Sequence, residues 1–148
     1  MDLEKLLIAV KHHGNRNEEK KDTIKYLRTD LLPKGSVIYN AKETDDDKLI
    51  CDGESYHGRA IVLWEKKAKR SRGYHCPACG TLCNNDPQKG NAIVGAHVVL
   101  DKKKRLIQKG DSFYIVPLCS SCNGKNKDSD FIRLNHSSVD GLCLQQIA

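Results

Sequence analysis

The chain has few aromatic residues and a modest share of apolar ones. Aromatics make up 5% of its 148 residues, and there is a single tryptophan. This scarcity argues against a surface that stacks the bases of single-stranded nucleic acid. It also predicts a thin apolar core, so an additional staple such as a structural metal ion is expected.

Signals for a membrane or for export are missing as well. No apolar run approaches the roughly 20 residues that span a bilayer. Residues 1–5 do not begin a secretory signal peptide, which consists of a basic region, an apolar segment and a cleavage site. We therefore expect a soluble, cytoplasmic protein with no membrane partner. In that reducing compartment the seven cysteines favour metal binding over disulfides.

The charge balance is basic, with a formal net charge of +6. Four thiolates holding one Zn²⁺ would lower it by two, to about +4. A basic protein favours a polyanionic partner, although many ordinary soluble proteins carry a similar charge.

The N-terminal half predicts helices and then extended structure. Helical spacing predicts one helix over residues 2–13 and a second from about residue 17, ended by Pro33. The second helix would present a stripe made of Ile24, Leu27, Leu31 and Leu32. Residues 36–39 and 48–51 are expected to pair as a hairpin. Residues 60–64 fit a strand or the start of a helix, and we favour a strand.

The C-terminal half predicts short strands. Residues 92–100 and 113–118 are apolar and rich in β-branched residues, so they predict a second hairpin joined by a basic connection. A short helix is expected after Asn123, followed by an apolar C-terminal tail. These patterns give an α+β fold in three segments, namely a helical and hairpin region (1–58), a metal-binding domain (59–136) and a tail (137–148).

Two Cys-x-x-Cys pairs are the most specific feature of the sequence. Zn²⁺ prefers four soft ligands in a tetrahedron, and each such turn supplies two thiolates from one loop. A four-thiolate shell leaves no position for a substrate water, so the ion would hold the fold together. The predicted ligands of a structural Zn²⁺ are Cys76, Cys79, Cys119 and Cys122.

Other assignments of these thiols are open. Iron also binds four thiolates, and Cys83 and His75 are close enough in sequence to compete as ligands. Cys51 and Cys143 are interpreted as small buried apolar residues.

The segment over residues 74–127 resembles the HNH nuclease superfamily and its zinc-stapled treble-clef members. The matching text is Cys76-Pro-Ala-Cys79, then Gly95-Ala-His97-Val, Ile115-Val-Pro-Leu-Cys119 and Ser121-Cys122-Asn123. The resemblance implies a ββα unit in which a knuckle and a hairpin lead into a helix that carries the second cysteine pair. The N-terminal part would be a helical extension.

The resemblance also implies active-site residues. His97 matches the family's general base, and an unperturbed imidazole pKa near 6.5 suits that task. Asn123 matches the helix residue that holds a catalytic Mg²⁺ or Mn²⁺. The family's other metal ligand is replaced by Ala96, and its orienting asparagine by Tyr114. With two of four positions lost, we expect weak or absent cleavage and favour a structural role for His97.

Two basic clusters flank the predicted metal domain and suggest phosphate contacts. Solvated surfaces explain such runs equally well. We expect a zinc-binding, HNH-like protein that binds nucleic acid, DNA more than RNA. The rival interpretations are an active metal-dependent endonuclease and a zinc-scaffolded protein-interaction module. The clusters are Lys66, Lys67, Lys69, Arg70 and Arg72, and then Lys102, Lys103, Lys104 and Arg105.

Overall fold

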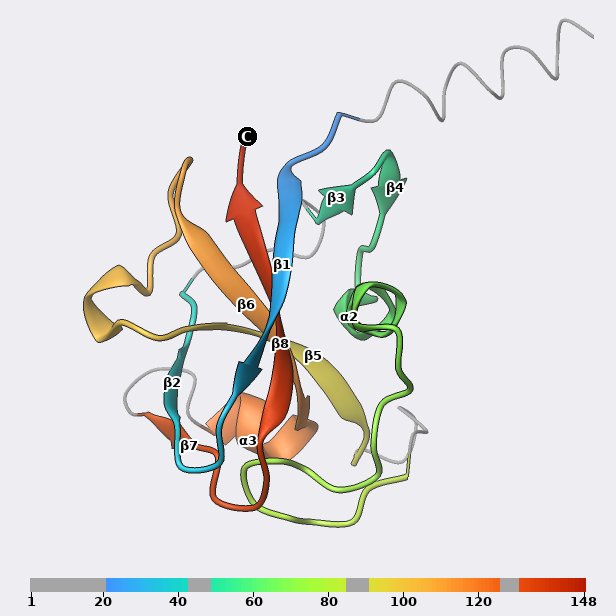
Figure 1. Cartoon of the computed structure of the whole chain (residues 1–148), viewed down its shortest axis with the longest axis vertical. Coiled ribbons are helices and arrows are strands. Elements are labelled where there is room, and N and C mark those ends of the chain that lie inside the picture. The colour runs from blue at the N-terminus through green and yellow to red at the C-terminus, as the bar shows by residue number, and fades with distance from the viewer. Residues whose placement is uncertain (1–20, 43–48, 85–90, 126–130) are drawn as a thin grey trace, which may run out of the picture.

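An antiparallel sheet of six strands forms the body of the protein (Figure 1). The structure is a computed structural model that describes residues 21–42, 49–84, 91–125 and 131–148. The strand order is β1-β8-β6-β5-β2-β7, and a separate hairpin holds the other two strands. The strands of the large sheet are β1 (Ile24–Leu32), β2 (Val37–Asn40), β5 (Ile93–Val99), β6 (Ser112–Cys119), β7 (Ile132–Arg133) and β8 (Val139–Gln146).

The predicted second hairpin is confirmed as β5 and β6. Their register places His97 opposite Ile115 and Ala96 opposite Val116. Both strands consist largely of β-branched and apolar residues, which fit a pleated surface buried on both sides. Strand β6 ends at Cys119, so the second cysteine pair begins where the sheet stops.

Strand β8 occupies the segment expected to be a C-terminal tail. It lies between β1 and β6 and pairs antiparallel with both. Gly141 packs closely against the ring of Tyr114, since a Cβ at residue 141 would be 2.8 Å from Cδ1 of that ring. Leu142 and Leu144 are fully buried. One sheet therefore contains strands from all three segments that the sequence suggested.

The helix predicted over residues 17–32 is wrong, because residues 24–32 form strand β1. Leu27 and Leu31, which belonged to the predicted helical stripe, are 39% and 64% exposed. The spacing therefore does not mark a buried face. Pairing with β8 along the length of β1 outweighs the local helical pattern. The helix predicted over residues 2–13 lies outside the described residues.

Helix α2 (Ala60–Ala68) forms where we favoured a strand. Its apolar residues pack against the sheet, and the Trp64 indole Nε1 donates a hydrogen bond to the carbonyl of Asp140 at 2.8 Å. A Cβ at Gly95 of β5 would lie 2.6 Å from the backbone nitrogen of Ile61. The absence of a side chain at Gly95 thus lets the start of α2 touch the sheet.

The predicted hairpin between residues 36–39 and 48–51 is also wrong. Strand β2 pairs with β5 and β7 instead. Strand β3 (Ile50–Cys51) pairs with β4 (Glu54–Ser55) across a two-residue turn. Asp52 and Gly53 have φ of 53° and 77°, and a tight turn that needs two positive φ angles favours this Asp-Gly pair.

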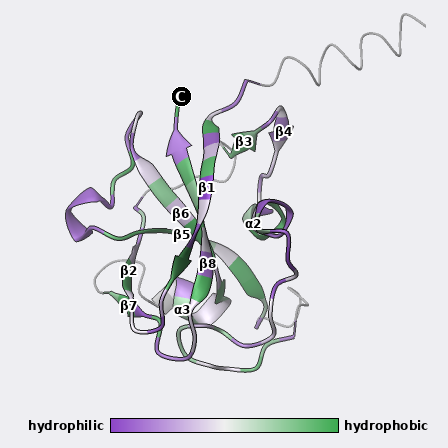
Figure 2. Ribbon diagram, viewed as in Figure 1, coloured by the Kyte–Doolittle hydropathy of each residue, from purple (hydrophilic) through white to green (hydrophobic). Residues whose placement is uncertain are grey.

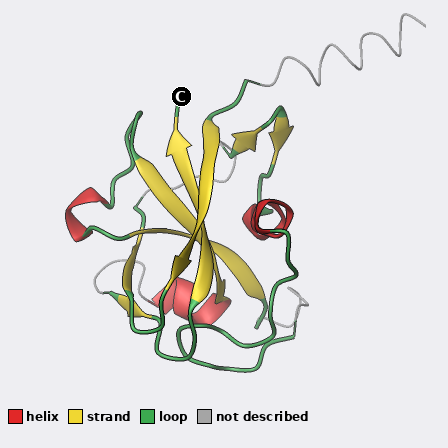
Figure 3. Cartoon of the chain, in the orientation of Figure 1, coloured by secondary structure: helices red, strands yellow, loops and turns green. Residues whose placement is uncertain are grey.

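The remaining helices are short. Helix α3 (Ser120–Lys125) follows β6, and a 3₁₀ helix, η3 (Lys102–Lys104), lies in the β5–β6 connection. Figure 3 shows η3 and α2 as red coils well apart from each other, with the sheet between them. Apolar residues concentrate along β5, whereas the C-terminal end of β8 is hydrophilic (Figure 2). None of the helices in the described ranges is long and apolar enough to span a membrane.

Candidate metal centre

Four cysteines from two distant parts of the chain meet where β6 ends and α3 begins. The Sγ atoms of Cys76, Cys79, Cys119 and Cys122 all lie within 4.8 Å of one another. Cys76 and Cys119 are buried, while Cys79 is exposed. Four soft donors at this spacing could hold a metal ion. These are the four residues that the sequence predicts as ligands.

The first cysteine pair sits on a tight turn. Gly80 has a φ of 77°, and its backbone N–H donates to the carbonyl of Cys76 at 2.8 Å. The turn is held from outside by residues 136–137, whose backbone N–H groups both donate to the carbonyl of Pro77. A Cβ at Gly80 would lie 2.7 Å from Nδ1 of His136. Glycine is therefore required here both by its φ angle and by the available space.

The second pair lies at the junction of β6 and α3. The backbone N–H of Cys119 donates to Sγ of Cys76 at 3.4 Å, and that of Cys122 donates to Sγ of Cys119 at 3.3 Å. Such bonds stabilise negative charge on sulfur. The end of β6 and the start of α3 therefore hold the thiols of Cys119 and Cys122 close to the turn that carries the first cysteine pair.

The surroundings shift the thiol pKa values in opposite directions. Burial would raise the pKa of Cys79, but hydrogen bonds with Thr81, Cys122 and Cys119 together outweigh it and lower the pKa to about 6. Burial raises the pKa of Cys119 to about 11. Because a metal binds thiolates, its arrival would displace the remaining protons from this cluster.

The competing ligands considered from the sequence stay outside the cluster. Sγ of Cys83 lies 3.5 Å from both the carbonyl of Thr81 and Oδ1 of Asn91. The His75 ring stacks on His136, with 5.6 Å between the centroids. All seven cysteines lie in the described part of the chain, and none of them is in a disulfide.

No protein-family model, curated protein or solved structure matches this chain. Its function is therefore inferred from its own residues and their arrangement.

His97 faces the side of the sheet that α2 covers. Side chains alternate along a strand, so His97 shares a face with Gly95, against which α2 begins. The imidazole stacks on Phe113, with ring centroids 5.6 Å apart and planes at 17°. Its Nε2 atom is buried. The ring thus packs against Phe113 on the face of the sheet that carries Gly95.

Asn123 belongs to the other side of the sheet. Asn40 of β2 is in register with Val98, which alternates with His97 along β5. The side-chain Nδ2 of Asn40 donates to the carbonyl of Asn123 at 3.0 Å. Helix α3 therefore lies on the face opposite His97, and the structure does not bring His97 and Asn123 together.

The other residues that could complete a catalytic site are committed to the fold. The Tyr114 hydroxyl donates to Oδ2 of Asp30 at 2.7 Å. Burial and this bond raise its pKa. The Asp101 carboxylate accepts from the backbone of Lys103, and that of Asp111 accepts from the backbone of Gln108. Each carboxylate thus stabilises the β5–β6 connection.

Most of the first basic cluster is paired with acidic groups. Lys66 contacts Glu54 at 2.9 Å, and Arg70 contacts Asp140 at 3.0 Å. Lys67 contacts Asp52, and Arg72 contacts Glu65. Lys69, at the C-cap of α2, has no ion pair within the described ranges. Four of the five positive charges of this cluster are therefore balanced by described acidic residues, and Lys69 carries the remaining one.

The second basic cluster divides into two kinds of residue. Lys102, Lys103 and Lys104 are exposed, and none is ion-paired to a described acidic residue. Arg105 is instead 5% exposed, and its Nε donates to the carbonyl of Asn40 at 2.8 Å. Its guanidinium supports the fold and is withdrawn from the surface on which we expected it.

Asn40 is a site-forming residue that the sequence did not indicate. It is 4% exposed and links β2 both to α3 and to Arg105. A single asparagine at the end of a short apolar run carries no distinguishing pattern. Only the tertiary arrangement identifies it as the residue that joins the helix of the metal centre to the basic connection.

Proposed function

We propose that the protein is a zinc-stabilised scaffold that binds nucleic acid through phosphate contacts. Zn²⁺ is the proposed ion because its bonds to sulfur are near 2.3 Å, which gives a tetrahedron with edges of about 3.8 Å. The Sγ atoms of Cys79 and Cys119 are 3.8 Å apart. With four protein ligands, the ion would have no open position for chemistry.

An HNH-like treble-clef unit is part of this proposal. Its support is the order of elements, in which a cysteine turn is followed by the β5–β6 hairpin and then by α3 with the second pair. The family's catalytic step is not proposed for this chain. His97 and the backbone of α3 lie on opposite faces of β5, so no divalent ion could bridge them.

The basic connection carries the nucleic-acid proposal. Lys102, Lys103 and Lys104 follow one another on η3, which Asp101 caps by accepting from the backbone of Lys103 at 2.9 Å. Lys42 is held beside them, since its N–H donates to the carbonyl of Arg105. All four lysines are exposed. Exposed ammonium groups carried on backbone that these bonds hold in place suit the phosphate backbone of a duplex.

The test is a salt titration in which the zinc-loaded protein binds a labelled DNA duplex. The fluorescence anisotropy of the label reports the binding. Three phosphate contacts, one for each lysine of η3, predict a slope of log K against log salt of about −2.7. Affinity should therefore fall about 40-fold between 50 and 200 mM salt. The triple variant K102A/K103A/K104A should lose most of the binding and most of the slope.

A matched control removes the same charge elsewhere. K21A/K25A/K34A also deletes three exposed lysines but leaves η3 intact, so it should bind nearly as the parent does. If both variants lost the same DNA affinity, the loss would come from the lower net charge and not from η3. Absence of binding by the parent at 25 mM salt would refute the proposal and favour a protein-interaction scaffold.

A further inference from the structure

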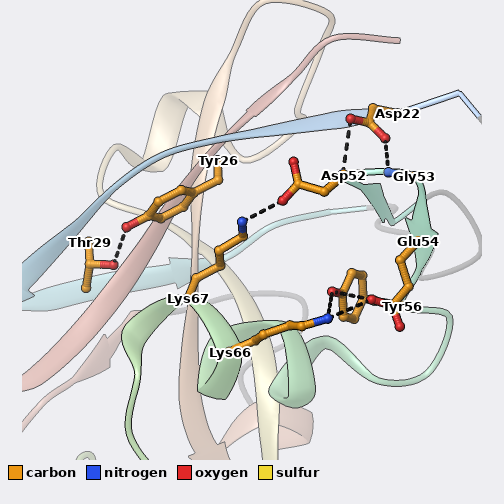
Figure 4. A network of polar contacts seen from close by, with 9 residues as sticks. All are labelled: Asp22, Tyr26, Thr29, Asp52, Gly53, Glu54, Tyr56, Lys66 and Lys67. Carbon is orange, nitrogen blue, oxygen red and sulfur yellow. Dashed lines mark hydrogen bonds and ion pairs between the residues drawn. The ribbon is translucent and has the colours of Figure 1, made fainter.

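A cleft of about 430 Å³ lies between α2, the β3–β4 hairpin and β1. Sites for small molecules commonly span a few hundred cubic ångströms and combine apolar walls with a few convergent polar groups. Figure 4 shows lysines of α2 reaching across toward the hairpin. The lining residues are Tyr26, Asp52, Glu54, Tyr56, Lys66, Lys67 and Lys69.

Contacts within the cleft hold two of its lysines in place. Lys67 contacts the Asp52 carboxylate, and its ammonium lies 5.2 Å from the centre of the Tyr26 ring. Lys66 donates to Oε2 of Glu54 at 2.9 Å and to the hydroxyl of Tyr56 at 3.3 Å. Each ammonium is thus oriented by an acid and a ring. A ligand would therefore lose little free energy in ordering these side chains.

These contacts do not use up the hydrogen-bond donors. An ammonium group has three N–H donors. The hydrogen bonds described take one from Lys67 and two from Lys66. Lys69 makes no side-chain hydrogen bond or ion pair with a described residue. Several N–H donors therefore remain for an incoming group with many acceptors.

The charge of the lining is positive. Three lysines line the cleft with two carboxylates, a formal excess of one positive charge. Arg59, which contacts Glu54 at 3.6 Å, is offset by Asp22, whose carboxylate accepts from the backbone of Asp52 and Gly53. A neutral or cationic ligand would leave this excess unmatched. A compact anion with several acceptor oxygens matches the sign of this excess and the N–H donors that remain.

The backbone at Lys69 is a second, independent observation. Among the described residues, Asp52 and Lys69 are the two non-glycine residues with positive φ. The turn of the β3–β4 hairpin accounts for Asp52. Lys69 has a φ of 57° at the C-terminus of α2, where glycine is the favoured residue. A side chain kept at such a position at a cost in backbone strain points to a role for its ammonium group.

We propose that this cleft binds a phosphate monoester, with the phosphate group held by Lys66, Lys67 and Lys69. The half-buried Tyr26 ring supplies a wall for the organic part of the ligand. The ester could be a free mononucleotide or the 5′-phosphate at the end of a nucleic-acid strand. Helix α2 and the β3–β4 hairpin, which line the cleft, lie well apart from η3 (Figure 3), so the site is separate from the proposed duplex-binding surface.

Isothermal titration calorimetry of the full chain provides the test. Adenosine 5′-monophosphate and inorganic phosphate should bind, whereas adenosine should not. Lys69→Gly should weaken binding at least about tenfold, as expected for the loss of a charge-assisted contact. The same variant should raise the Tm, because glycine relieves the positive φ. A purely structural lysine would give no loss of binding.

Controls separate this site from the others. Lys34→Ala removes an exposed lysine in the β1–β2 turn and should leave nucleotide binding unchanged. K102A/K103A/K104A should lose duplex binding yet keep nucleotide binding. Comparing an oligonucleotide with and without a 5′-phosphate identifies the source of the ester. Absence of heat with both phosphate probes, or equal binding by Lys69→Gly and the parent, would overturn the proposal.

Discussion

Replacing Gly95 with alanine tests how closely α2 covers the face of the sheet that carries His97. The added Cβ would lie 2.6 Å from the backbone nitrogen of Ile61, 2.7 Å from the carbonyl carbon of Ala60 and 2.8 Å from its Cβ. Two of these atoms belong to the backbone of the first turn of α2. They cannot move aside by changing a rotamer, so the start of the helix has to shift.

The expected cost of this shift is about 3 kcal/mol, at the upper end of the range for overpacking. For a chain of this length, 1 kcal/mol corresponds to about 3 °C in Tm, so Gly95→Ala should melt about 9 °C below the parent. Circular dichroism at 222 nm during heating, with urea unfolding as a second measure, would record the difference.

Gly73→Ala is the matched control. A Cβ at Gly73 would meet no atom within 4 Å. That variant should be neutral or slightly stabilised, because alanine restricts the unfolded chain more than glycine does. If Gly95→Ala melted within about 1 °C of Gly73→Ala, α2 would not cover this face, and an open groove beside His97 would have to be reconsidered.

Two further predictions concern the metal centre and the chemistry. Cys119→Ser should reduce bound zinc from about one ion per chain to well below that, measured by atomic emission, and should lower the Tm; Cys143→Ser, a buried thiol outside the cluster, should keep the full metal content. Iron in place of zinc would correct the identity of the ion, and full loading of Cys119→Ser would exclude this cysteine as a ligand. Parent and His97→Ala should leave supercoiled plasmid equally intact with Mg²⁺ or Mn²⁺, and nicking that only the parent performs would restore His97 as a general base.

The sequence was most informative where the chemistry itself dictates spacing. Two cysteine turns predict a four-thiol cluster because the ligand shell requires it, and the four thiols do gather. The β5–β6 hairpin could be predicted because both runs are β-branched and bounded by turns. In each case the information lies within a few neighbouring residues.

The errors arose where distant pairing decides the structure. Leucines 27 and 31 fall at helical spacing, yet β1 is extended because β8 supplies a partner along its length. Residues 60–64 are apolar enough for a strand, and only the close approach at Gly95 shows why a helix packs there. Neither fact could be read from a local pattern.

The candidate site was predictable in part for the same reason. The resemblance to the HNH superfamily brought His97 and Asn123 into one motif, but it could not reveal that α3 lies across the sheet from the imidazole. It also could not distinguish Arg105, which is buried against Asn40, from the exposed lysines that precede it. Which side of a strand faces which helix depends on the whole sheet.

The place of β8 in the sheet has a consequence for how the protein is made. On the ribosome, β1 and β6 emerge well before β8, yet β8 is the strand that joins them. Until it emerges, β1 lacks its partner and β6 has an unpaired edge, which exposes a nascent chain to aggregation. A frameshift at residue 139 would therefore remove the strand that attaches β1 to the rest of the sheet, even though every cysteine of the metal centre would already have been translated.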